Sequence, residues 1–215
     1  MAKRWRWRVS DEVHRRVRMG ALDVGAGRVA AIDQLDLAAA NVEAGDKGVA
    51  VNAYLQSTSN PKIYAAGDAA DTQGAPLTPV AVFEGKVAAS NMLKGNRTKP
   101  DYSGVPSAVF TVPELTRVGM LEQDAREAGH DIRVVENDTG DWYSNLRVGE
   151  SCAATKVIID KDSDTILGAH LLGPEYGEII NFFGLAIRLG LTTSDLKKMV
   201  SVYPSVGSDL GSMLS

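Results

Sequence analysis

Hydrophobic and polar positions alternate in short segments along the second half of the chain, which is typical of strands. We expect strands over residues 108–111, 116–119, 132–136, 156–160 and 165–172, and helices over 122–128, 174–189 and 194–200. Helical spacing over residues 174–189 places five apolar residues on one face: Tyr176, Ile179, Ile180, Phe183 and Ile187. Strands and helices in this order favour an α+β fold with an antiparallel sheet.

The first half of the chain has fewer regular patterns. Residues 48–52 follow a turn and predict a short strand, and residues 63–66 predict a second one that is buried on both faces, because all four are apolar. A helix is expected over residues 79–94, since Pro79 is tolerated in a first helical turn and Gly95 suits the position after the last turn. Residues 96–106 are polar and contain two prolines, which indicates a boundary.

Composition is that of an ordinary globular protein, with 215 residues of which 44% are hydrophobic and 23% charged. No apolar run is long enough for a membrane span, and the first residues do not resemble a signal peptide. The single cysteine, Cys152, excludes an intramolecular disulfide and a dithiol redox pair, and it fits a reducing, cytoplasmic compartment. We expect Cys152 to be a packing residue.

Charge is distributed unevenly. The net charge is −4, yet residues 1–20 carry +5 and the rest of the chain therefore carries −9. Within residues 1–20, polar and apolar positions alternate around Trp5, Trp7 and Val9, which suits an edge strand; a non-native leader is the other interpretation. Both are favoured over nucleic-acid binding, because no zinc spacing or RNA-binding aromatic motif accompanies the basic residues.

Candidate chemistry is concentrated where the segment 63–66 meets Gly67 and Asp68, ten residues before the expected helix. Gly67 lets a ligand approach the backbone closely, and Asp68 offers a carboxylate to hydroxyl groups. The helix start at Thr78, Pro79 and Val80 directs backbone N–H groups and the positive end of the helix dipole toward an electron-rich group. The alternative is purely structural: Asp68 caps a turn or helix, and Thr78, Pro79 and Val80 only begin a helix.

These two motifs, together with Val-Phe-Thr-Val-Pro-Glu at 109–114 and Ile-Leu-Gly-Ala-His-Leu-Leu-Gly at 166–173, resemble the pyridine nucleotide–disulfide oxidoreductases. This family includes glutathione reductase, mercuric reductase and dihydrolipoamide dehydrogenase. The resemblance implies that residues 21–100 are the C-terminal part of an FAD-binding domain and that 101–215 form a dimerisation domain. It also implies FAD as cofactor, with five residues contacting it: Gly67, Asp68, Thr78, Pro79 and Val80.

The sequence departs from this family in three ways. It contains no G-x-G-x-x-G motif for the pyrophosphate of FAD, no second such motif for NAD(P)H, and no redox cysteine pair. We therefore expect a truncated relative in which electron transfer from NAD(P)H through FAD is impaired or absent, and its status as an enzyme stays open. Tyr203 and Ser208 occupy the family's acid/base positions, so no catalytic residue is assigned; a tyrosine is a poor proton carrier at neutral pH, and an aromatic packed at the interface is the preferred interpretation of Tyr203.

The alternative function is a non-catalytic homodimerisation module, built on the helix 174–189 and on residues 201–214. Such a module could also pair with full-length relatives, and neither a nucleic acid nor a membrane is expected as a partner.

No metal site is predicted. The acidic spacing at Asp160, Asp162 and Asp164 starts like a calcium loop, but the required glycine and glutamate are missing, which favours a polar hairpin turn. The three histidines, His14, His130 and His170, lie far apart in the sequence.

Overall fold

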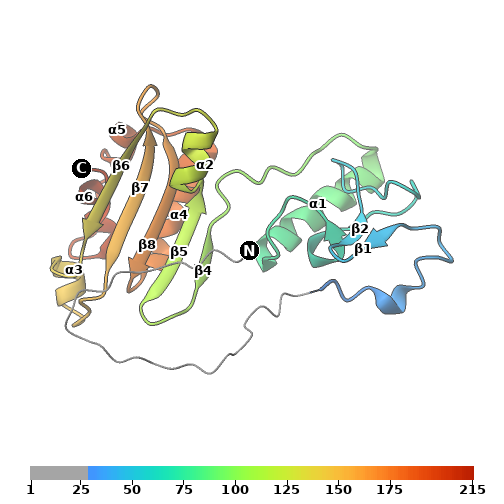
Figure 1. Cartoon of the computed structure of the whole chain (residues 1–215), viewed down its shortest axis with the longest axis horizontal. Helices are drawn as coiled ribbons and strands as arrows, with labels where there is room; N and C mark the ends of the chain where they lie inside the picture. Colours follow the sequence, from blue (N-terminus) through green and yellow to red (C-terminus); the bar gives the residue numbers. More distant parts are fainter. Residues whose placement is uncertain (1–28) are drawn as a thin grey trace.

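The computed structural model describes residues 29–215, so the predicted edge strand or leader within residues 1–20 lies outside the described residues. Figure 1 shows two groups of elements, here called the smaller unit (residues 29–95) and the larger unit (residues 107–215), joined by an extended segment. Within residues 29–215, no helix combines the length and apolar character needed to cross a bilayer.

A small sheet and one long helix form the smaller unit. Strand β2 (Gly48–Ala50) pairs with β1 (Ala44–Gly45) in antiparallel and with β3 (Ala70–Asp71) in parallel orientation. Two short 3-10 helices, η1 (Asp33–Leu35) and η2 (Gly67–Ala69), accompany them. Helix α1 (Thr78–Lys94) has Pro79 in its first turn and Gly95 directly after its last residue, as predicted, and it buries Val80, Val87 and Ala88.

The prediction of a buried strand over residues 63–66 is wrong. The segment is extended and half-buried, and it contributes only an isolated bridge between Tyr64 and Gln56. Hydrogen bonds from the Ala65 and Ser57 N–H groups to the carbonyls of Leu55 and Ile63 pair it with residues 55–57. A strand buried on both faces needs neighbours on both edges and layers on both faces, and the described residues supply this segment with one neighbour.

An antiparallel five-stranded sheet forms the larger unit, with the order β4-β5-β8-β7-β6. Its strands are β4 (Ser107–Val109), β5 (Glu114–Gly119), β6 (Ile132–Asp138), β7 (Ala154–Asp160) and β8 (Ile166–Gly173). Its helices are α2 (Glu122–Glu127), α3 (Tyr143–Leu146), α4 (Tyr176–Leu189), α5 (Thr193–Leu196) and α6 (Leu210–Met213), with the 3-10 helix η3 (Val206–Asp209) before α6. This arrangement confirms the predicted α+β class with an antiparallel sheet.

Helix α4 covers one face of this sheet and α2 packs on the other (Figure 1). The predicted apolar face of α4 is its buried face, where Tyr176 and Phe183 are fully enclosed against strand residues such as Val157 and Leu171. Leu210, Met213 and Leu214 close the same core from the C-terminal end. Residues 201–214, expected at an association surface, therefore also contribute core residues to their own unit.

Two local predictions for the larger unit need correction. The last predicted helix, 194–200, is only the single turn α5, which a capping box at Thr192 and Asp195 begins. Cys152 is exposed and is not a packing residue. It lies among polar neighbours, where its N–H donates to the Glu150 carboxylate at 2.7 Å, and the buried strand β7 starts only after it.

Candidate cofactor site

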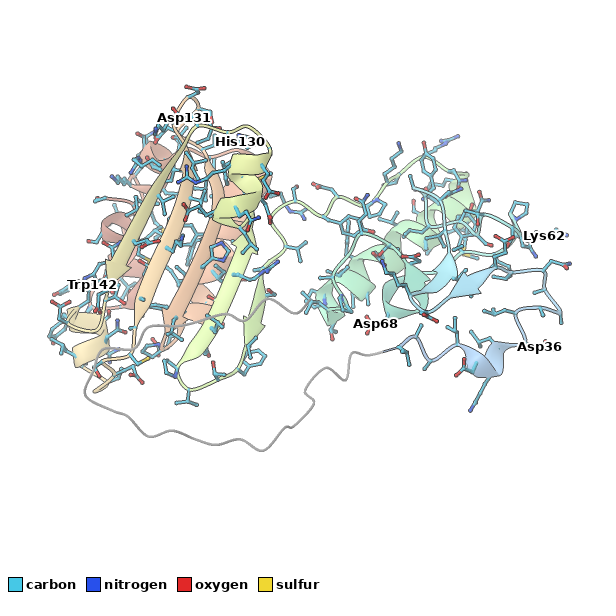
Figure 2. The ribbon with its side chains drawn as sticks, viewed as in Figure 1. Asp36, Lys62, Asp68, His130, Asp131 and Trp142 are labelled. Atoms are coloured by element: carbon cyan, nitrogen blue, oxygen red, sulfur yellow. The ribbon has the colours of Figure 1, made fainter. Side chains whose placement is uncertain are left out.

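A cavity of about 290 Å³ in the smaller unit brings together three of the five residues expected to bind a cofactor. Gly67, Asp68 and Val80 line it, whereas Thr78 and Pro79 do not. Asp68 is exposed and lies at the edge of the smaller unit (Figure 2). The sequence motifs thus converge on one concave surface between η2 and the start of α1.

Gly67 meets two constraints that favour glycine. Its φ is +65°, a left-handed conformation that side chains with a Cβ adopt at a cost. A Cβ at this position would also lie 2.8 Å from the Ala81 Cβ on α1. The close approach of this turn to the helix therefore depends on the absence of a side chain, and the expected approach of a ligand to Gly67 stays a prediction.

The N-terminus of α1 provides donors that the helix itself does not use. Leu77 is the N-cap and its side chain forms no capping hydrogen bond. The first N–H with an intrahelical acceptor is that of Ala81, which donates to the Leu77 carbonyl at 3.0 Å. Pro79 has no N–H, so the expectation that all three residues at the helix start present donors is wrong for Pro79 and stays a prediction for Thr78 and Val80.

Glu84 is the residue of this site that sequence reasoning missed. Its carboxylate is fully buried beneath the cavity and accepts from the Gly67 N–H at 2.6 Å, the Thr72 hydroxyl at 2.8 Å and the Tyr102 hydroxyl at 2.7 Å. Burial and the bond to Glu84 raise the pKa of Tyr102 to about 12, so the phenol stays a donor at neutral pH. The signal available in the sequence was a charged residue at helical spacing from Val80 and Val87, on the face of α1 that is buried.

Tyr203 and Ser208, the two residues expected at acid/base positions from the resemblance, have separate local contacts. Tyr203 is 75% exposed and its ring stacks on Tyr143 with the centroids 6.3 Å apart. Ser208 forms a capping box with Ser205 at the start of η3. Asp209 accepts a hydrogen bond from the Ser144 hydroxyl, and burial raises the pKa of the Asp209 carboxyl. The capping box and the hydrogen bond from Ser144 give Ser208 and Asp209 structural roles within the larger unit.

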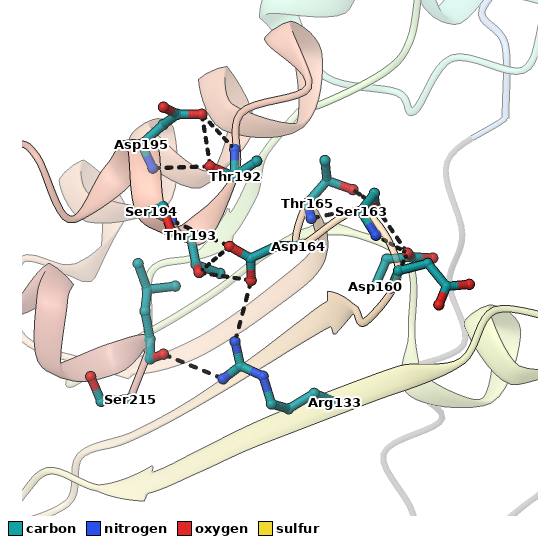
Figure 3. Close-up of polar contacts among 12 residues, drawn as sticks. Arg133, Asp160, Ser163, Asp164, Thr165, Thr192, Thr193, Ser194, Asp195 and Ser215 are labelled. Carbon is teal, nitrogen blue, oxygen red and sulfur yellow. Dashed lines mark hydrogen bonds and ion pairs between the residues drawn. The ribbon is translucent and has the colours of Figure 1, made fainter.

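The acidic turn between β7 and β8 is a hydrogen-bonded hairpin turn, as predicted (Figure 3). The Asp160 carboxylate accepts from the Ser163 N–H and hydroxyl, both at 3.0 Å. The Asp164 carboxylate accepts from the Thr193 hydroxyl and pairs with Arg133 at 3.5 Å. Among residues 29–215, no three His, Cys, Asp or Glu side chains are grouped so that they could hold a metal ion.

The two described histidines have separate partners within the larger unit. His130 Nδ1 lies 2.8 Å from the Asp160 carboxylate. His170 Nε2 lies 3.1 Å from the Met120 carbonyl, and burial lowers the pKa of His170. Each of the two described histidines therefore has a local partner in the larger unit.

A second candidate surface lies on α4, on the side away from the sheet. Phe182, Leu185 and Leu189 are exposed there by 39%, 52% and 61%, although they belong to a helix whose other face forms the core. Exposed apolar residues gathered on one helix face are typical of an association surface.

Comparison with known proteins identifies relatives of both units. The family model described as "Pyridine nucleotide-disulphide oxidoreductase, dimerisation domain" matches residues 105–213, and the one described as "Pyridine nucleotide-disulphide oxidoreductase" matches residues 3–85. An uncharacterized 19.7 kDa protein in a mercuric resistance operon of Staphylococcus aureus is 51% identical over 180 residues, which are 84% of this chain and 100% of that protein.

Longer relatives match over only part of their length. Mercuric reductase from Staphylococcus aureus is 35% identical over 87% of this chain, which spans 34% of that enzyme. The solved structure of the HOCl-induced flavoprotein disulfide reductase RclA from Escherichia coli, as a Cu(II) complex, aligns with a TM-score of 0.78 and 29% identity; the alignment covers 87% of this chain and 42% of that one. The chain thus spans about a third to two fifths of these longer proteins.

Proposed function

Because this chain belongs to the pyridine nucleotide-disulphide oxidoreductase family, we propose that its residues 67–80 hold part of an FAD molecule. The supporting observation is the cavity lined by Gly67, Asp68 and Val80 beside the uncapped start of α1. The Asp68 carboxylate would accept hydrogen bonds from the ribityl hydroxyls, and the N–H groups of Thr78 and Val80 would donate to the electron-rich edge of the flavin ring. In an intact relative, the bound FAD supplies electron transfer from NAD(P)H to a substrate.

We expect the cavity lined by Gly67, Asp68 and Val80, here called the cofactor corner, to bind FAD weakly by itself. Its volume of about 290 Å³ is at the lower end of small-molecule sites, so the described residues enclose a part of the cofactor. The pyrophosphate would lack the G-x-G-x-x-G turn, which the 215-residue sequence does not contain. We also propose that electron transfer is impaired or absent in this chain alone, without an NAD(P)H site.

A cytoplasmic location of the protein is a separate proposal, based on the single free Cys152.

The test is a visible absorption spectrum of the purified protein, before and after FAD is added and free FAD is removed by gel filtration. A retained flavin band that Asp68→Ala diminishes supports the proposal. Asp33→Ala is the matched control, because Asp33 is an exposed aspartate of the same unit outside the cavity lining. A weak complex is measured at equilibrium, and a flavin spectrum that stays unchanged at high protein and FAD concentration, before free FAD is removed, would contradict the proposal.

Self-association is the second candidate function, in which residues 101–215 act as a homodimerisation module that can also pair with full-length relatives. The specific observation in its favour is the exposed apolar face of α4 with Phe182, Leu185 and Leu189. The proposed division into residues 21–100 and 101–215 assigns this face to the dimerisation domain.

Sedimentation velocity tests this second function with two chemically identical substitutions. Leu185→Glu places a charge on the exposed face of α4 and is expected to dissociate the assembly. Leu115→Glu makes the same change at a position that is 40% exposed on β5, where the alternate residues Thr116 and Val118 face the core, and it should leave assembly intact. Equal effects of both variants would refute α4 as the association surface. Mixing with a full-length homologue then tests hetero-dimer formation directly.

A further inference from the structure

Glu84 connects three separate segments through one carboxylate. The Gly67 N–H comes from the cofactor corner, the Thr72 hydroxyl from the loop after β3, and the Tyr102 hydroxyl from the segment that joins the two units. These four residues are called the Glu84 cluster. A buried carboxylate that accepts three short hydrogen bonds fixes the position of each donor more firmly than neutral acceptors do.

The backbone around the Glu84 cluster leaves little room for another arrangement. A Cβ on Gly74 would lie 2.6 Å from Glu84 Oε1 and 2.8 Å from Tyr102 Cε1, so the backbone packs directly against both side chains. The Tyr102 ring also contacts the Phe83 ring edge to face, with the centroids 6.3 Å apart. The position of Tyr102 is therefore defined by its ring as well as by its hydroxyl.

Helix α4 holds the chain on both sides of Tyr102. Arg188 Nη2 donates to the Asp101 carbonyl at 3.1 Å and to the Ser103 carbonyl at 2.9 Å. Gly104 comes so close to α4 that a Cβ there would lie 2.2 Å from the Gly184 carbonyl oxygen. The hydroxyl that reaches Glu84 thus belongs to a segment clamped onto the helix of the other unit.

We propose that Glu84 is the positioning residue of the cofactor corner, and that Tyr102 makes the conformation of Gly67 depend on the clamp formed by Arg188. This inference rests on the proposed binding of FAD at Gly67 and Asp68. Clamping of the linker on α4 and binding of a ligand at Gly67 then favour each other, because a coupling between two sites is reciprocal. The Thr72 hydroxyl stabilises the same carboxylate from within the smaller unit.

The test compares Tyr102→Phe with Tyr64→Phe. Tyr64 is a matched control, since its hydroxyl donates at 2.7 Å to Asn96, outside the Glu84 cluster. The readouts are the amide-proton chemical shift of Gly67 without FAD and the FAD dissociation constant. Tyr102→Phe should move the Gly67 amide and weaken FAD binding about fivefold, the equivalent of one ordinary hydrogen bond. Arg188→Gln should move the Gly67 amide in the same direction, and Tyr64→Phe should change neither readout.

Each outcome separates this inference from the proposed function. FAD binding with an unchanged Gly67 amide in Tyr102→Phe and Arg188→Gln would overturn the inference alone. A shifted amide in a protein that binds no FAD would overturn the proposed function and support the positioning of Gly67 by the cluster. Glu84→Gln should give the largest shift of the Gly67 amide, because an amide NH₂ cannot accept a hydrogen bond. If the Glu84→Gln variant does not fold, Thr72→Val is measured in its place, since it removes one donor from the same carboxylate.

Discussion

Replacing Gly67 with alanine tests the geometry of the cofactor corner. Two costs add at this position. The φ of +65° costs a residue with a Cβ roughly 1–2 kcal/mol. The new Cβ would also lie 2.8 Å from the Ala81 Cβ on α1, and relieving such an overlap costs about 1–3 kcal/mol. We therefore expect Gly67→Ala to destabilise the smaller unit by roughly 2–5 kcal/mol and to weaken FAD binding.

Gly190→Ala is the matched control for this substitution. Gly190 follows α4 with a φ of +63°, and a Cβ added there would meet nothing within 4 Å, so only the conformational cost applies. Native-state hydrogen exchange measures the opening of each unit separately, at Ala88 on α1 and at Ala186 on α4, both of which are buried. The reasoning is refuted if Gly67→Ala lowers the opening free energy at Ala88 no more than Gly190→Ala lowers it at Ala186.

Three further predictions concern the larger unit. Phe183→Ala removes a fully buried ring from the core and should lower the free energy of unfolding by about 3–5 kcal/mol in urea titrations followed by circular dichroism; a loss below about 1 kcal/mol would contradict it. Thr192→Ala removes the capping box of α5 and should cost about 1 kcal/mol in the same titration, whereas an unchanged midpoint would argue against the cap. Hydrogen bonds from the Ser163 backbone, His130 and the Ser163 hydroxyl lower the pKa of Asp160 from 3.8 to about 2. The stability this contributes is present above pH 3.8 and is lost as the pH falls toward 2, so Asp160→Ala should flatten the stability curve there, and an unaltered slope would refute the linkage.

Helices and strands in which apolar residues recur regularly over many residues could be predicted from the sequence. The helices at 78–94 and 176–189 and the strands of the larger sheet appear within a few residues of the predicted bounds. Single-turn helices were harder to predict. Helices α3 and α6 each have four residues, which leaves no room for a repeated apolar pattern. Helix α5, predicted as residues 194–200, is likewise a single turn. The segment 63–66 failed for a different reason, because its strand assignment depended on neighbours that a local pattern does not specify.

The residues of the candidate site also differ in how far the sequence reveals them. Two short motifs single out Gly67, Asp68 and Val80, and the structure brings the three residues to one cavity; their contact with a cofactor stays a prediction. Glu84 could not be assigned a role from the sequence, since its partners lie 17 residues before it at Gly67 and 18 residues after it at Tyr102. Its function as an acceptor exists only once the turn, the loop and the linker have folded around it.

The two proposed functions meet on α4. Arg188, which clamps the linker, lies on the same helix as Leu185 and Leu189, the residues proposed for association. Association through that helix would exclude water from the Arg188 contacts, and hydrogen bonds strengthen where water is excluded. A firmer clamp would hold Tyr102 on Glu84 and thereby fix Gly67 in the conformation that lines the cavity. If both proposals hold, self-association and cofactor binding form one linked equilibrium, and a dimer of this chain would bind FAD more tightly than the monomer.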